Sequence, residues 1–359
     1  MRNVEFTLFD FDDLLIEPAH ISPIRSRKEI NPKYDNGYYP LMTAPMDTVI
    51  SKDNHKLFGN LGIRSVVPRG EGYYDQNYND THFNSYGLDE FNEIFINGDV
   101  EILTDSKIYV LIDIANGHMR ALYDSAKTAK EKYGDKMVLM IGNVANPKTF
   151  AEYCSIGVDY IRIGIGNGGG CLTTVQTGVG FPMASLIEEC YDVKKYMEFP
   201  NIKIVADGGF KSYSDIIKAL ALGADYVMLG SILNKSLESS GETTRLRQSH
   251  KPHFDQHIVI DQYSEEAKKM FEAGTPLFKT FRGMSTKEVQ KSWGKEELKT
   301  SEGVVRTHKV EYTLEGWINN FDSYLRSAMS YTGKKELHEF IGGVQLNFIS
   351  QNSYKRFSK

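Results

Sequence analysis

Residues 158–174 read VDYIRIGIGNGGGCLTT, an apolar run that leads into a glycine-rich loop carrying one thiol and two hydroxyls. The run 158–163 has the apolar character of a buried strand. Five glycines in the seven positions 164–170 permit backbone angles that side chains forbid, and they let a ligand approach the main chain. Cys171 has two interpretations: a buried structural thiol, or a nucleophile whose thiolate is stabilised by neighbouring N–H groups. A buried strand that ends in such a loop is typical of α/β folds.

Strand-like segments alternate with helical ones along the rest of the chain. The pattern predicts eight strands, at 39–43, 63–67, 108–112, 137–141, 160–163, 202–206, 226–229 and 277–280, and helices that include 119–133, 147–154, 212–222 and 316–331. Eight such units predict a (β/α)8 TIM barrel with catalytic groups on the loops after the strands, and a doubly wound sheet is the alternative. We expect one domain over 1–359, with insertions at about 70–106 and 235–275. The second insertion is expected to be a solvated surface excursion, and a flap at about 285–310 is expected to follow strand eight.

Composition limits the classes of function. The chain has 359 residues, 41% of them hydrophobic, with a formal net charge of −5, which argues against nucleic acid as a partner. No apolar run approaches the ~20 residues of a membrane span, and the polar N-terminus does not read as a signal peptide. The three cysteines, at 154, 171 and 190, have neither paired nor metal-ligand spacing. We therefore expect reduced thiols, no membrane partner and a cytoplasmic protein.

The loop continues as TGVGFP at 177–182, and with this continuation it resembles the active-site loop of the IMP dehydrogenase/GMP reductase family. In that family the cysteine attacks carbon 2 of a purine nucleotide, so the resemblance assigns Cys171 as nucleophile. Loop carbonyls in the family often hold a monovalent cation such as potassium, which would here be bound by Gly166, Gly168 and Cys171. The resemblance covers all but the insertions and the tail beyond about residue 337. The first insertion is too short for the regulatory nucleotide-binding module of long family members, which we expect to be absent.

A nucleotide site is expected from five further motifs. ADGG at 206–209 and LGS at 229–231 place glycines after two strands, where N–H groups can point at one phosphate, while Asp207 can accept hydrogen bonds from a ribose. The motifs MTAPMDTV at 42–49, FRGMS at 281–285 and SEG at 301–303 resemble family segments that contact the nucleotide. Phe281 lacks the hydroxyl that contacts phosphate in the dehydrogenases. The expected ligands of a purine ribonucleotide 5′-monophosphate are Met46, Asp207, Gly208, Gly209, Gly230, Ser231, Gly283, Met284 and Glu302.

A nicotinamide site is expected beside the thiol. IDIANGH at 112–118 resembles the GMP reductase element that borders the nicotinamide, and Gly142-Asn143 belongs to the same wall. The expected cofactor ligands are Asp113, Ala115, Asn116, Gly117 and Asn143. His118 is either an acid–base group or an exposed turn histidine. We expect NADPH, with NADH as the alternative, and no flavin.

The direction of the reaction depends on the flap. A dehydrogenase needs a base to activate water, for which the family uses an Arg-Tyr pair, but residues 286–305 contain neither arginine nor tyrosine. A reductase must instead protonate departing ammonia, and the resemblance assigns this role to Thr173 and Glu288, the latter one place beyond its expected position. A GMP reductase-type homotetramer is therefore expected. The alternatives are an IMP dehydrogenase, an enzyme acting on a modified purine nucleotide and a non-catalytic nucleotide-binding barrel.

Overall fold

The computed structural model describes residues 7–70, 82–102, 106–247, 256–283, 286 and 303–357. Within these ranges, one sheet holds eight parallel strands in the order β2-β9-β8-β7-β6-β5-β4-β3. A bridge between Met42 and Arg64 joins its two edges, so the sheet is nearly closed as a barrel. The strands are β2 Leu41–Thr43, β3 Val66–Val67, β4 Phe83–Tyr86, β5 Ile108–Asp113, β6 Met137–Val144, β7 Tyr160–Ile163, β8 Lys203–Asp207 and β9 Tyr226–Leu229. The predicted (β/α)8 barrel is confirmed.

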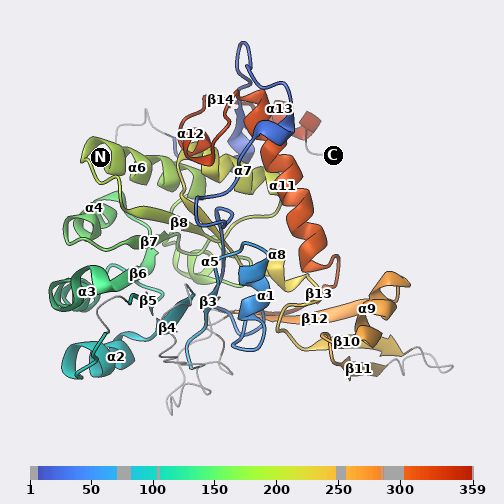
Figure 1. Ribbon diagram of the computed structural model, residues 1–359, viewed down its shortest axis with the longest axis horizontal. Helices are drawn as coiled ribbons and strands as arrows, with labels where there is room; N and C mark the ends of the chain where they lie inside the picture. Colours follow the sequence, from blue (N-terminus) through green and yellow to red (C-terminus); the bar gives the residue numbers. More distant parts are fainter. Residues whose placement is uncertain are drawn as a thin grey trace.

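Helices pack around the outside of the barrel (Figure 1). They are α1 His55–Asn60, α2 Leu88–Phe91, α3 Arg120–Tyr133, α4 Pro147–Ser155, α6 Met183–Tyr196, α7 Tyr213–Leu222 and α11 Leu314–Tyr331, and the four predicted helices are among them. Local sequence explains their ends. Helix α7 starts with a capping box between Ser212 and Asp215 and stops at Gly223 in the left-handed conformation.

Shorter elements complete the described chain. Strand β1 Leu14–Ile16 pairs antiparallel with β14 Leu346–Phe348, which places a segment near the start of the sequence beside one near its end (Figure 1). The remaining short elements are η1 Phe11–Asp13, η2 Arg27–Glu29, η3 Asn92–Asn97, η4 Gly134–Lys136, α5 Thr173–Thr177, α8 Ser231–Asn234, α12 Leu337–Phe340 and α13 Gln351–Phe357. Among the described residues, no helix combines the length and apolarity needed to cross a membrane.

The barrel interior is packed, with a charge at its N-terminal end. Met42, Phe83, Leu111 and Met228 belong to the inner core. Arg64 lies at this end of the barrel and is only 4% exposed. Five aromatic rings have their centroids between 5.2 and 5.9 Å from the Arg64 guanidinium carbon, those of Tyr38, Phe83, Tyr109, Tyr160 and Tyr226. The barrel is therefore closed at this end, which leaves the opposite end for a site.

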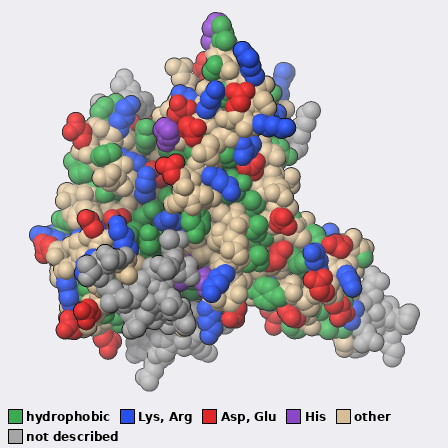
Figure 2. Space-filling model, in the orientation of Figure 1, with side chains coloured by type: hydrophobic (Ala, Val, Ile, Leu, Met, Phe, Trp, Pro, Cys, Tyr) green, Lys and Arg blue, Asp and Glu red, His purple; other side chains and the backbone are tan. Residues whose placement is uncertain are grey.

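The last predicted strand is not part of the barrel. It forms β12 Leu277–Arg282, which pairs antiparallel with β10 Thr243–Arg247 and β13 Val305–Lys309. With β11 Gln256–Ile260 and helix α9 Glu265–Glu272, these strands form a lobe, here called the arm, that projects from the barrel (Figures 1 and 2). The insertion predicted at 235–275 lies at the surface, and it is an ordered lobe whose strands and helix cover a small core of Leu237, Ala267, Leu277 and Val310.

The missing barrel strand is β4, inside the stretch assigned to the first insertion. The polar residues Asn84 and Ser85 and the Tyr/Asn/Asp-rich surroundings hide it, although Phe83 and Tyr86 are buried. Strand β12 was predicted to be a barrel strand but is not one. Its alternation of buried and half-buried residues is typical of a strand that is covered on one face only. As a result β8 and β9 are the seventh and eighth barrel strands. The predicted flap follows an arm strand, and its residues 305–309 form β13.

Candidate active site

A cavity of about 560 Å³ opens at the C-terminal end of the barrel strands, where barrel enzymes carry their active sites. Its wall combines loops after the barrel strands with residues of the arm. The predicted site residues that line it are Met46, Asp113, Ala115, Asn143, Gly166, Gly168, Cys171, Thr173, Asp207, Gly208, Gly209, Gly230, Ser231 and Gly283. Met284, Glu288 and Glu302 lie outside the described residues.

The loop after β7 presents the thiol. Cys171 is half-buried, and its Sγ lies 3.3 Å from Thr173 Oγ1, at the start of α5. Thr174 Oγ1 lies within hydrogen-bond distance of the carbonyls of Ile165 and Val179, which ties the two ends of the loop together. Gly166 has φ +78°, and a Cβ there would lie 1.7 Å from Thr174 Oγ1. The glycine is therefore required for the fold of the loop, and the loop holds thiol and hydroxyl together at the cavity.

The base of the arm packs against this loop. The N–H of Val304 donates to the Gly170 carbonyl at 3.2 Å, and the N–H of Gly283 donates to the Val304 carbonyl at 3.0 Å. The Phe281 ring is so close to Gly170 that a Cβ on this glycine would lie 3.1 Å from it. The position of the thiol loop is therefore linked to that of the arm.

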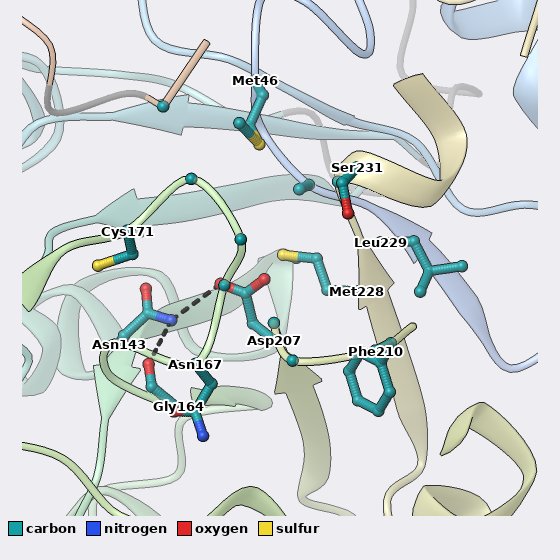
Figure 3. A pocket seen from close by; sticks show the side chains of 18 of the residues that line it. Met46, Asn143, Gly164, Asn167, Cys171, Asp207, Phe210, Met228, Leu229 and Ser231 are labelled. Carbon is teal, nitrogen blue, oxygen red and sulfur yellow. Dashed lines mark hydrogen bonds between the residues drawn. The ribbon is translucent and has the colours of Figure 1, made fainter. Parts of the chain in front are cut away.

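A buried arginine connects two carboxylates on the floor of the cavity. Arg162 donates from Nε to Asp207 Oδ2 at 2.8 Å and from a terminal nitrogen to Asp113 Oδ1 at 2.6 Å. Asn143 donates to the same Asp207 oxygen at 2.9 Å and to the Gly164 carbonyl at 2.8 Å. Figure 3 shows Asp207 between Cys171 and Ser231, and a dashed line joins one of its carboxylate oxygens to the Asn143 amide nitrogen. Among the described residues Asp207 Oδ1 has no hydrogen-bond partner, so it is available to a ligand.

Electrostatics keep Arg162 charged. Burial disfavours its charge, but Asp207 and Asp113 outweigh burial and raise its pKa above the ordinary value. Sequence reasoning missed this residue. The available signal was a lone cation inside a buried strand, between Ile161 and Ile163, because such a charge requires a partner.

The glycines after β8 and β9 bring backbone close to the cavity. Gly208 has φ +92°, and a Cβ there would lie 2.8 Å from the backbone nitrogen of Gly168. At Gly230 a Cβ would lie 3.0 Å from Met46 Sδ. These loops follow the seventh and eighth barrel strands, which is where barrels frequently bind phosphate.

Asn116, Gly117 and His118 do not line the cavity. The N–H of Gly117 donates to the Asn143 carbonyl at 2.7 Å, and Asn116 Oδ1 accepts from the His118 N–H at 3.2 Å. His118 Nε2 accepts from the Ala145 N–H at 3.1 Å, and burial lowers the pKa of the ring. These contacts favour the turn interpretation of His118 over acid–base chemistry and give Gly117 a part in shaping the wall behind Asn143.

The arm and the neighbouring loops contribute basic residues that sequence reasoning did not select. Lys235, Arg306 and His308 line the cavity, together with Arg69 and Lys211. His308 stacks on Phe281 with ring centroids 4.8 Å apart, and its Nδ1 lies 2.8 Å from Asn234 Oδ1. These contacts depend on the pairing of β12 with β13, for which the sequence offered no local signal.

The loop carbonyls have the right chemistry for a cation. Carbonyl oxygens are hard ligands with two lone pairs each, and the Gly168 oxygen accepts one hydrogen bond, from the Cys171 N–H at 3.0 Å. Among the described residues, no group of three or more His, Cys, Asp or Glu side chains has the arrangement of a metal site.

Comparison with known proteins finds the family that the sequence motifs resemble. The family model described as IMP dehydrogenase / GMP reductase domain matches residues 96–254. The GMP reductase of Caenorhabditis elegans is 28% identical over 350 residues, which cover 92% of this chain and 88% of that protein. The GMP reductase of Vibrio vulnificus (strain YJ016) is 28% identical over 361 residues, 94% of each chain. That of Buchnera aphidicola subsp. Acyrthosiphon pisum (strain Tuc7) is 29% identical over 363 residues, 94% of this chain and 93% of that protein.

The matched domain begins before β5 and extends past β9, so it includes the thiol loop and both glycine motifs. Together with matches that run over nearly the whole length of the chain, this shows that the chain is similar to proteins of the IMP dehydrogenase/GMP reductase family.

Proposed function

We propose that the protein is a GMP reductase-type enzyme, which converts GMP to IMP and ammonia with NADPH as the reductant. The observation that carries the proposal is the Cys171 thiol, 3.3 Å from the Thr173 hydroxyl in a cavity that also presents Asp207 and the glycine motifs. Binding alone would need neither a thiol nor an adjacent hydroxyl. The relatives named GMP reductase support the same direction of reaction.

The nucleotide would lie across the loops after β2, β8 and β9. The backbone of Gly208, Gly209, Gly230 and Ser231 would take the phosphate, and Asp207 Oδ1 would accept from the ribose. Met46 would contact the nucleotide, and Gly283 would close the wall behind it. Met284 and Glu302 keep the roles that the resemblance assigns to them, contact with the nucleotide and recognition of the base edge.

The chemistry begins with addition of the Cys171 thiolate to carbon 2 of the purine. The exocyclic amine leaves as ammonia after protonation, and Thr173 is placed beside the sulfur to relay that proton, with Glu288 as the assigned acid. A bound NADPH would supply the hydride for carbon 2. The C–S bond breaks as this C–H bond forms, which releases IMP and regenerates the thiolate. Asp113, Ala115 and Asn143 would border the nicotinamide, with Asn116 and Gly117 behind them.

Three finer points rest on the resemblance alone. NADPH is proposed with NADH as the alternative. A potassium ion is proposed at the carbonyls of Gly166, Gly168 and Cys171, and the assembly is proposed to be a homotetramer. The oxygen chemistry of the loop fits such a cation.

The test is the near-ultraviolet absorbance of the nicotinamide in two mixtures, GMP with NADPH and IMP with NAD. Consumption of NADPH with GMP, reduced at least about 1,000-fold in Cys171→Ser, is the expected result. Cys154→Ala is the matched control, because burial raises the pKa of the Cys154 thiol to about 12 and this residue lies away from the cavity. Formation of NADH from IMP would instead identify a dehydrogenase, and inactivity with both pairs would contradict the proposal.

A further inference from the structure

The arm places an imidazole near the glycine motif that follows β9. His308 lies on the cavity wall and stacks on Phe281 at an interplanar angle of 22°. The same Phe281 ring lies 4.0 Å from the Cβ position of Gly230. Lys235 follows the short helix α8 that begins at Ser231, and it lines the cavity as well. His308 is thus next to the part of the cavity where the phosphate of a nucleotide is proposed to bind.

The structure fixes which nitrogen of His308 carries the proton in the neutral ring. Asn234 is fully buried, and its amide nitrogen donates to the carbonyls of Thr48 at 2.7 Å and Thr280 at 3.0 Å. Because carbonyls only accept, this orientation leaves the Asn234 oxygen as the acceptor that faces His308. Nδ1 of His308, 2.8 Å away, must therefore donate.

The other nitrogen of the ring is available to a ligand. Nε2 has no hydrogen-bond partner among the described residues, and the His308 residue as a whole is partly exposed. In the neutral ring it bears a lone pair, which would repel a phosphate oxygen. In the protonated ring it carries an N–H that can donate a charge-assisted hydrogen bond.

The surrounding charges favour an anion. Arg306, on the same strand, and Lys235 line the cavity with His308, and the Lys235 ammonium pairs with Glu311 at 2.9 Å. Lys279, the partner of His308 across β12 and β13, donates to the Ser239 carbonyl at 2.5 Å. Burial and the charges of Lys235 and Arg306 lower the pKa of His308, and Glu311 opposes them. An anion bound here would reverse the effect of the positive charges.

We propose that His308 binds the 5′-phosphate of the purine nucleotide through Nε2 and takes up a proton when the nucleotide binds. The inference rests on the proposed function and deepens it. Phe281 presents only a ring to the phosphate region, and His308, held on that ring and oriented by Asn234, supplies a polar contact. Tightness of nucleotide binding should therefore depend on pH through this residue.

The test compares His308→Asn with wild type by calorimetric titration of GMP without NADPH, at about pH 6 and about pH 8. Asparagine keeps an N–H near the position of Nδ1 for Asn234 but removes Nε2. We expect the variant to bind GMP about 10-fold more weakly at pH 6 and within about 2-fold of wild type at pH 8. Because each ratio is taken at one pH, the titration of the phosphate itself cancels. Guanosine, which lacks the phosphate, should bind both proteins equally.

His257→Asn is the matched control, because His257 also lies on the arm beside a phenylalanine, Phe278, but does not line the cavity. It should leave both affinities unchanged. A loss in His308→Asn that is equal at the two pH values, or equal for guanosine, would overturn the inference. If wild type fails to bind GMP, the proposed function is wrong, and inorganic phosphate titrated against the same variants still decides whether His308 binds phosphate.

Discussion

Replacing Arg162 with methionine would leave Asp113 and Asp207 buried without their common counter-charge. The exposed fraction of the side chain is 11% for Arg162, 12% for Asp113 and 17% for Asp207. Removing one partner of a buried ion pair costs about 3–5 kcal/mol, because the remaining charge keeps its desolvation penalty. Asp207 would retain the hydrogen bond from Asn143, whereas within the described residues the Asp113 side chain has no other hydrogen bond. We therefore expect Arg162→Met to lose about 3–5 kcal/mol of unfolding free energy at neutral pH, mostly through Asp113.

Urea unfolding, followed by fluorescence and circular dichroism together, measures this loss and checks that unfolding is two-state. Arg162→Met/Asp113→Asn removes both charges of the 2.6 Å pair and should recover more than half of the loss. Arg162→Lys keeps the charge but replaces the two nitrogens that contact the two carboxylates with a single ammonium on a differently shaped side chain, so its stability should lie between those of wild type and the methionine variant. If the methionine variant stays within about 0.5 kcal/mol of wild type and Asp113→Asn restores nothing, the ion-pair argument is refuted.

Two further predictions concern the thiol and the arm. Thr173→Val removes the hydroxyl that lies 3.3 Å from the Cys171 sulfur. Single-turnover reduction of GMP should therefore slow about 100-fold or more, while the Kd for GMP stays within about 2-fold of the wild-type value. A change confined to the Kd would contradict the proton-relay role. Lys279 is fully buried, and burial lowers its pKa to about 7, with Glu238 opposing. Between about pH 7 and 10 this lysine is therefore protonated in the unfolded chain but neutral in the folded protein, so the folded state becomes more stable as the pH rises. From pH 7 to 9 the free energy of unfolding of wild type should rise by about 1–2 kcal/mol relative to that of Lys279→Met, as measured by urea unfolding. Parallel pH profiles for the two proteins would show that this lysine does not titrate on unfolding.

Sequence predicted the positions of the glycine-rich loops better than it predicted which segments form the eight barrel strands, because the loop motifs are local. Clusters of glycine can be recognised from neighbouring residues alone, although the contact that requires Gly208 is made with Gly168 in another loop. The loops after β7, β8 and β9 were therefore placed correctly at the ends of strands, and the cavity unites them. Strands β8 and β9 were predicted to be the sixth and seventh strands of the barrel but are the seventh and eighth, since the motifs carry no information about how many strands precede them.

The errors arose where a residue's environment depends on distant partners. Asn84 and Ser85 read as loop residues, but parallel pairing with β3 and β5 makes them part of a strand. The segment 277–280 reads as a barrel strand, but its partners are antiparallel arm strands. Arg162 and His308 were missed for the same reason. Their roles follow from Asp113, Asp207 and Asn234, none of which is near them in sequence.

The arrangement also explains why the arm matters to a site built mainly by the barrel. The barrel loops supply the thiol, the carboxylates and the glycine backbone, whereas the basic side chains Arg306 and His308 come from β13. The hydrogen bond from Val304 to Gly170 joins the start of β13 to the loop that carries the thiol. A nucleotide held by the proposed contacts would touch both parts, with its phosphate near His308 and its base near Cys171. Substitutions that shift β13 should therefore change binding and chemistry together, while those confined to β11 and α9, away from the cavity wall, should change neither.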